Sequence, residues 1–195
     1  MDLFFSLALQ ILYGIANLAL ISLGLAIVFG MMRVINLAHG EFIMLGGYTV
    51  VVATNNGVNL WFAMLILAPL VVGLIGLIVE RCLIQWLYGR MIDTLLATWG
   101  LSLLFIGIIT SIFGASTSTV VSPPLGTVTI GEYTSSGYEL FLIFVVIVLL
   151  ALVYLTLKFT SLGLVARATM QNSDMSACLG ISTSKIYMVT FSLGA

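Results

Sequence analysis

The 195-residue sequence is 62% hydrophobic and 7% charged, with a mean hydropathy of +1.27 and a net charge of −1. Soluble domains carry about 25% charged residues, so this composition excludes a water-soluble fold, and the charge balance excludes the basic surface of a nucleic-acid-binding protein. The apolar runs are too long for barrel strands, and helices satisfy their own backbone hydrogen bonds in lipid. We therefore expect an all-α integral membrane protein, a polytopic helical bundle.

Apolar runs of the length needed to cross a bilayer recur along the chain. A helix needs about 20 apolar residues to cross a hydrocarbon core of about 30 Å. We expect five complete spans, at residues 3–32, 42–53, 60–79, 94–113 and 140–157, and the start of a sixth near Ser184. The second run reaches the necessary length only if residues 36–41 also enter the membrane region. Because residues 186–195 are apolar without a stop signal, we expect a C-terminally truncated chain.

The stretch 33-RVINLAHGEF-42, between the first two runs, places the only histidine of the chain, His39, beside Glu41. Ionisable groups cost about 2.5–3.5 kcal/mol at the bilayer centre, so their presence next to a span needs a reason. One interpretation is structural: Asn36 caps the entering helix, and Glu41 meets the positive end of the helix dipole. The other is functional, with Asn36, His39 and Glu41 lining the inner end of a translocation path. His-Gly-Glu does not match a metal site.

Small and charged residues mark the third run. Gly73 and Gly76 allow the backbone of another helix to approach, so we expect them at a helix-packing interface. Glu80 and Arg81 stand at the end of the run. Their adjacency indicates a local ion pair, and exposed pairs of this kind stabilise little.

The segment 161–185 is the longest stretch between the fifth and sixth runs, and it predicts a short helix from about Leu164 to Leu179. Its apolar face comprises Leu164, Ala168, Met175, Cys178 and Leu179. Gly180 suits a left-handed C-terminal cap, and Ser182 or Thr183 can cap the next membrane helix. The helix either lies on lipid headgroups or docks onto a soluble partner. Docking is favoured because headgroup-binding helices carry several basic residues, and this one carries a single arginine.

Every basic residue falls on the same side of the predicted spans. These residues are Arg33, Arg81, Arg90, Lys158, Arg167 and Lys185. Because basic loops remain in the cytoplasm, the N-terminus is predicted to lie outside the cell. The opposite side holds the loop 115–139, where alternation at residues 127–133 indicates a short strand or hairpin.

Four stretches together resemble a known family. They are 23-LGLAIVFGMMRVINLAHGEFIMLGGY-48, 80-ER-81, 94-TLLATWGLSL-103 and 163-GLVARATMQNSDMSACLGIST-183. The chain resembles the membrane permease subunit of bacterial ABC importers of the branched-chain amino acid and urea class. The resemblance leans toward the urea importer, and the alternative is an importer of branched-chain or other amino acids. The lean rests on residues 95–100 and on Gln171, Asn172, Met175, Ala177 and Cys178.

The resemblance also implies partners and a location. Residues 1–195 would form one ABC transporter transmembrane permease domain, incomplete at the C-terminus, in the bacterial inner membrane. It would work with a second permease subunit, two ATP-binding cassette subunits and a periplasmic solute-binding protein. The chain lacks the phosphate-binding pattern GxxxxGK[ST], so ATP would be bound by the partners and this chain would carry no cofactor.

Two sets of residues are expected to carry the function implied by the resemblance. The translocation path would be lined by Asn36, His39, Glu41, Thr98, Trp99 and Ser102. Coupling to the ATP-binding subunits would involve Arg167, Met170, Asp174, Met175, Leu179 and Gly180. These residues serve transport and not catalysis.

Two other classes of protein compete with this interpretation. A stand-alone secondary transporter or channel would titrate His39 and Glu41 during transport, but it has no need of the helix near residues 164–179. A membrane enzyme would need a reactive constellation, and the sequence offers neither HExxH nor a nucleophile with a paired base in one span. The sequence therefore predicts a transport subunit and not an enzyme.

Overall fold

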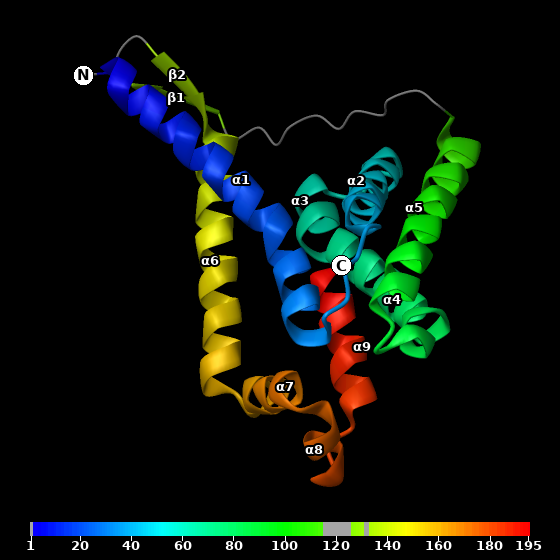
Figure 1. Ribbon diagram of the computed structural model, residues 1–195. Coiled ribbons are helices and arrows are strands. Elements are labelled where there is room, and N and C mark those ends of the chain that lie inside the picture. The colour runs from blue at the N-terminus through cyan, green and yellow to red at the C-terminus, as the bar shows by residue number, and fades with distance from the viewer. Residues whose placement is uncertain (1, 115–125, 131–132) are drawn as a thin grey trace. The chain divides into compact units, whose positions relative to one another are not determined.

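The computed structural model describes residues 2–114, 126–130 and 133–195, and these are mainly helical (Figure 1). The chain divides into two compact units. The first comprises Met1–Leu23 and Val121–Leu164, and the second comprises Gly24–Val120 and Val165–Ala195. The all-helical membrane architecture predicted from composition is confirmed, with one small hairpin added.

The first unit contains most of α1 (Asp2–Met32), all of α6 (Gly137–Phe159) and the hairpin. Its core is a small cluster in which Ala16 of α1 meets Ile143 and Val146 of α6. The strands β1 (Thr127–Ile130) and β2 (Tyr133–Ser136) pair antiparallel, so the hairpin is the correct one of the two predicted alternatives. The rest of the loop prediction, at residues 115–125, lies outside the described residues.

The second unit contains the end of α1 and the elements within residues 24–120 and 165–195. They are α2 (His39–Asn55), α3 (Leu60–Phe62), the π-helical turn η1 (Ala63–Leu67), α4 (Ala68–Cys82), the 3-10 turn η2 (Ile84–Leu87), α5 (Met91–Phe113), most of α7 (Ser161–Gln171), α8 (Ser173–Cys178) and α9 (Thr183–Gly194). The predicted third span is thus one helical segment interrupted by η1. Pro69, in the first turn of α4, explains the interruption because proline donates no backbone hydrogen bond and crowds the preceding turn.

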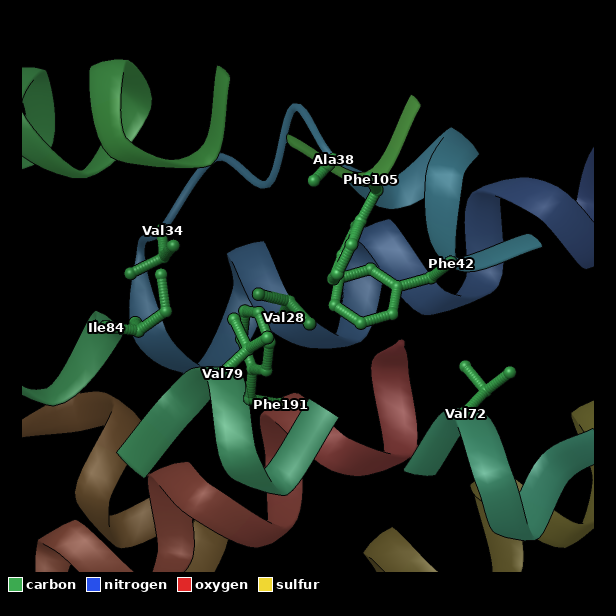
Figure 2. Packing of buried hydrophobic residues seen from close by; sticks show 9 residues of the cluster. All are labelled: Val28, Val34, Ala38, Phe42, Val72, Val79, Ile84, Phe105 and Phe191. Carbon is green, nitrogen blue, oxygen red and sulfur yellow. The ribbon is translucent and has the colours of Figure 1, made fainter. Parts of the chain in front are cut away.

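Three aromatic rings form the centre of the second unit (Figure 2). Phe42 of α2 is fully buried, and its ring meets Phe105 of α5 edge-on at 5.5 Å between centroids. It also meets Phe191 of α9 edge-on, at 6.1 Å. Edge-to-face contacts of this kind contribute about 0.5–1.5 kcal/mol beyond area burial. Phe42 therefore fixes the start of α2 against both α5 and α9.

Glycines bring the backbones of three helices close together in this unit. A Cβ on Gly76 of α4 would lie 3.3 Å from Ser192 Cα of α9, and Ser192 Oγ donates to the Gly73 carbonyl at 2.8 Å. The predicted packing role of Gly73 and Gly76 is confirmed. At the end of α1, a Cβ on Gly24 would clash with the carbonyl oxygen of Gly194.

Four helical segments of the described chain are long and apolar enough to cross a membrane: Leu7–Met32, Leu60–Cys82, Met91–Phe113 and Gly137–Phe159. They correspond to the first, third, fourth and fifth predicted spans. The second, α2, has 17 residues, which at 1.5 Å per residue gives about 25 Å. It begins at His39 and so includes part of the polar segment 36–41, but it remains shorter than the other four. Of the five full-length spans that were predicted, four are therefore confirmed as long enough to cross a membrane, and the second, α2, is not.

Candidate functional site

A polar cluster, buried except for the half-buried Glu41, lies where the chain enters α2 and meets the side of α5. We use this name for Asn36, Glu41, Thr98 and Ser102. Thr98 Oγ1 donates to the Ile35 carbonyl and accepts from the Leu37 amide, each at 3.2 Å. Ser102 Oγ donates to Glu41 Oε1 at 2.7 Å. The structure therefore brings together residues that are about sixty positions apart in the sequence.

Two of the six residues predicted to line the path, His39 and Trp99, do not belong to the polar cluster. His39, at the start of α2, is buried, and its Cε1 lies 2.7 Å from where a Cβ on Gly24 would stand, so its ring faces α1. Trp99 is 55% exposed, whereas Thr98 is fully buried. Successive residues on a helix point about 100° apart, so these neighbours cannot both face the cluster. Trp99 is therefore placed away from the polar cluster.

Asn36 does not cap α2 as predicted. The helix begins two residues later than that role requires, and its N-cap position is taken by Ala38. Asn36 Oδ1 instead accepts from the Ala38 amide at 3.1 Å, which closes a tight turn ahead of the helix. Its Nδ2 is buried and has no acceptor among the residues that the structure describes. Asn36 thus brings an unused donor to the polar cluster.

Glu41 stands in the first turn of α2, as predicted, where the helix dipole favours a carboxylate by about 0.3–1 kcal/mol. One of its oxygens is held by Ser102. The described residues offer no donor to the other oxygen. A carboxylate that is oriented by one hydrogen bond and retains a free oxygen is suited to receive a cationic group.

Glu80 does not pair with Arg81 as predicted. It is only 1% exposed and accepts a hydrogen bond from the hydroxyl of Tyr88, while Arg81 points outward to Gln85. The reason is again helical geometry, since adjacent positions face different directions. Burial, and then the hydrogen bond to Glu80, raise the pKa of Tyr88 above its ordinary value, so the phenol remains a donor at neutral pH.

The predicted helix over residues 164–179 is instead two helices, α7 and α8, with a break at Asn172. Asn172 has extended backbone angles, and its Oδ1 accepts from the Met175 amide at 2.9 Å, so it caps α8. An asparagine followed by an acidic residue in the next turn is an N-cap signal, and the sequence carries it as Asn172 and Asp174. The prediction of a single helix was therefore wrong, although the sequence contained the signal for a second helix start.

Most of the predicted apolar face of the α7–α8 segment is exposed. Leu164 is 63% exposed, Met175 61% and Leu179 75%. The side that packs inward carries the small residues Ala166, Thr169 and Ser176. Cys178 is also exposed, and Ala168 is half-buried. The segment therefore presents large apolar side chains outward.

The cap at Gly180 is confirmed. Gly180 has a φ of 83°, its amide donates to the Ala177 carbonyl at 3.0 Å, and the Ile181 amide donates to the Ser176 carbonyl at 3.1 Å. These two bonds form a Schellman motif, which ends α8. Ser182 occupies the N-cap position of α9, as one of the two predicted alternatives, but its side chain makes no capping bond.

The other predicted coupling residues lie on the outer side of the same segment. Arg167 and Asp174 are exposed, and Met170 is 37% exposed. None of these three side chains takes part in an ion pair or ring contact within the described residues. The exposed side of this segment carries Arg167, Met170, Asp174, Met175, Leu179 and Gly180, and we call these residues the α7–α8 surface.

Long apolar helices, glycine-mediated packing and polar groups held between helices define a helical membrane protein. A family profile described as the branched-chain amino acid transport system permease component matches residues 7–195, and the chain belongs to this family. Its curated relatives include the high-affinity branched-chain amino acid transport system permease proteins LivH of Escherichia coli and Salmonella typhimurium, each 25% identical over 194 residues. Protein BraD of Pseudomonas aeruginosa, with the same description, is 29% identical over 192 residues.

These alignments cover 91% of this chain and 62% of each relative, so the chain spans less than two thirds of their length. No solved structure gives a significant match. The lean toward a urea importer is not supported, because the named relatives are all permeases for branched-chain amino acids. None of the named relatives is described as a urea permease, so the resemblance at residues 95–100 and 171–178 gains no support from them.

Proposed function

We propose that this chain forms part of the membrane permease of an ATP-driven importer of branched-chain amino acids. The observation that carries the proposal is the family match over residues 7–195, together with relatives described as branched-chain amino acid permeases. The bilayer is the inner membrane, with the basic loops in the cytoplasm and the N-terminus outside. The transport partners are a second permease subunit, two ATP-binding subunits and a periplasmic solute-binding protein.

The polar cluster is the proposed contact for the substrate as it passes. A branched-chain amino acid carries an ammonium and a carboxylate on a small apolar body. The free oxygen of Glu41 suits the ammonium, and the unused Nδ2 of Asn36 suits the carboxylate. Thr98 and Ser102 hold the two segments in place. In this proposal His39 supports packing against Gly24, and Trp99 faces lipid or the second permease subunit.

The substrate is tested by uptake into proteoliposomes that contain the complete transporter, assembled from the full-length permease and its partners. We expect labelled leucine or valine to accumulate only when ATP is enclosed and to be unaffected by an excess of urea. A proton ionophore should leave uptake unchanged. Accumulation of urea in place of leucine would restore the urea interpretation. Uptake that does not depend on ATP but depends on the proton gradient would instead identify a secondary transporter.

The α7–α8 surface is the proposed contact for the ATP-binding subunits. Met175 and Leu179 present apolar side chains outward, and Arg167 and Asp174 flank them with one charge of each sign. An exposed apolar ridge bordered by opposite charges is suited to a groove in a soluble domain. A helix that lies on headgroups would carry more basic residues than this segment has.

Valine at Gly180 is expected to uncouple ATP hydrolysis from uptake. The left-handed backbone at this position costs a residue with a Cβ about 1–2 kcal/mol, which would loosen the end of α8. Gly57 is a matched control, since it has a φ of 82° and ends α2 with the same pair of hydrogen bonds. Gly57→Val should lose similar thermal stability but retain the normal ratio of ATP hydrolysed to leucine transported. Equal coupling in both variants would contradict the proposed role of α8.

A further inference from the structure

A pocket of about 360 Å³ opens between the end of α4 and the start of α9. Its lining residues come from two segments of the chain: Arg81, Gln85, Trp86 and Tyr88 from the first, and Thr183, Ser184 and Tyr187 from the second. All of these residues belong to the second unit. The volume is within the range of ligand pockets, and neither the polar cluster nor the α7–α8 surface includes it.

The polar groups that line this pocket are a guanidinium, an amide, an indole N–H and hydroxyl groups, so the lining includes a positive charge and no carboxylate. Arg81 forms no ion pair in the described part of the chain, and its recorded side-chain hydrogen bond is a long one, 3.4 Å, to Gln85. Thr183 and Ser184 add hydroxyl groups from the first turn of α9, whose amides receive no bond from the Ser182 side chain. A guanidinium beside hydroxyl groups and a helix start favours an acceptor-only group, which is a carboxylate in a protein side chain.

Two of the lining residues are tyrosines that pack against each other. The Tyr88 hydroxyl donates to the buried Glu80, and the Tyr88 ring meets Tyr187 of α9 edge-on, at 5.0 Å between centroids. Glu80 itself does not line the pocket. Trp86, another lining residue, is 76% exposed. Exposed tryptophans beside an arginine are the residue types that most often anchor protein interfaces.

The position of the pocket indicates which partner fills it. Thr183 follows the Gly180 cap of α8 by three residues, so the pocket continues the α7–α8 surface along the chain. Both carry basic residues that place them in the predicted cytoplasmic part of the protein. We propose that this pocket receives an aspartate or glutamate side chain of the ATP-binding subunit, as a second contact beside α8. The proposal rests on the proposed function, which supplies that partner.

Reversal of the charge at Arg81 tests the proposal in the assembled transporter. Arg81→Glu is expected to weaken retention of the ATP-binding subunit by about tenfold, and Arg81→Lys by less, because lysine keeps the charge but not the two-pronged geometry. Arg90→Glu is the matched control. Arg90 lies at the other end of the connection from α4 to α5 and pairs with Asp93 at 3.6 Å. It does not line the pocket, so the Arg90→Glu variant should retain the ATP-binding subunit normally.

A photo-crosslinking residue in place of Ser184 tests the same contact without changing a charge. It should join this chain to the ATP-binding subunit, at a segment that contains an acidic residue. A crosslink only to lipid, or normal subunit retention by Arg81→Glu, would overturn the pocket proposal while ATP-driven uptake by the native transporter persists. If no ATP-binding subunit is retained by the native chain and uptake does not depend on ATP, the proposed function itself fails.

Discussion

Glutamine in place of Glu41 is expected to reduce ATP-driven uptake of leucine at least tenfold, a loss of about 1.4 kcal/mol of substrate interaction. Glutamine has nearly the same size and can still accept the hydrogen bond from Ser102. It removes only the negative charge, which in our proposal attracts the ammonium group of the substrate. The measurement is the initial rate of uptake in proteoliposomes, at equal amounts of assembled transporter.

Glu139→Gln is the control for this prediction. Glu139 is the third residue of α6, and Glu41 is the third residue of α2, so both carboxylates meet the positive end of a helix dipole. Among the residues that the structure describes, Glu41 has a side-chain hydrogen-bond partner on another helix and Glu139 has none. Uptake by the Glu139→Gln variant should remain near that of the native protein. Near-native uptake by both variants would show that transport does not need the negative charge of Glu41, and would contradict its proposed contact with the ammonium group of the substrate.

Alanine in place of Gly24 is expected to destabilise the protein strongly. The added methyl group would clash with the Gly194 carbonyl and stand 2.7 Å from the His39 ring, and backbone cannot move aside as a flexible side chain can. Overpacking of a well-packed site costs about 1–3 kcal/mol. We expect a lower midpoint of thermal unfolding in detergent and reduced uptake, because α9 and the start of α2 would both be displaced.

Gly14 provides the comparison, since it lies in the same helix and a Cβ there meets nothing within 4 Å. Gly14→Ala should leave the midpoint unchanged or raise it slightly, because alanine favours the helix by about 0.5–1 kcal/mol. Opposite shifts for the same substitution in one helix would assign the effect at Gly24 to packing. A stable Gly24→Ala variant would contradict the close approach of α1 and α9.

Local signals in the sequence were sufficient for the positions of most elements. The first run was predicted to begin at residue 3 and end at 32, and α1 spans Asp2–Met32. The hairpin and the cap at Gly180 were also predicted correctly. Hydropathy, alternation and glycine conformation act within a few neighbouring residues, so the sequence alone determines them. The break at Asn172 was available from the same kind of local signal but was missed.

Tertiary structure decided which side chains meet. Both Thr98 and Trp99 were predicted from the sequence to line the translocation path. In the structure Thr98 is buried and Trp99 is exposed. From the sequence, an ion pair between Glu80 and Arg81 was predicted. In the structure, Glu80 instead accepts a hydrogen bond from Tyr88, eight positions away. The contact between Leu37 and Thr98 joins residues 61 positions apart. Such pairings depend on which helix faces pack together, and that choice minimises the free energy of the whole unit, so no short stretch of sequence contains it.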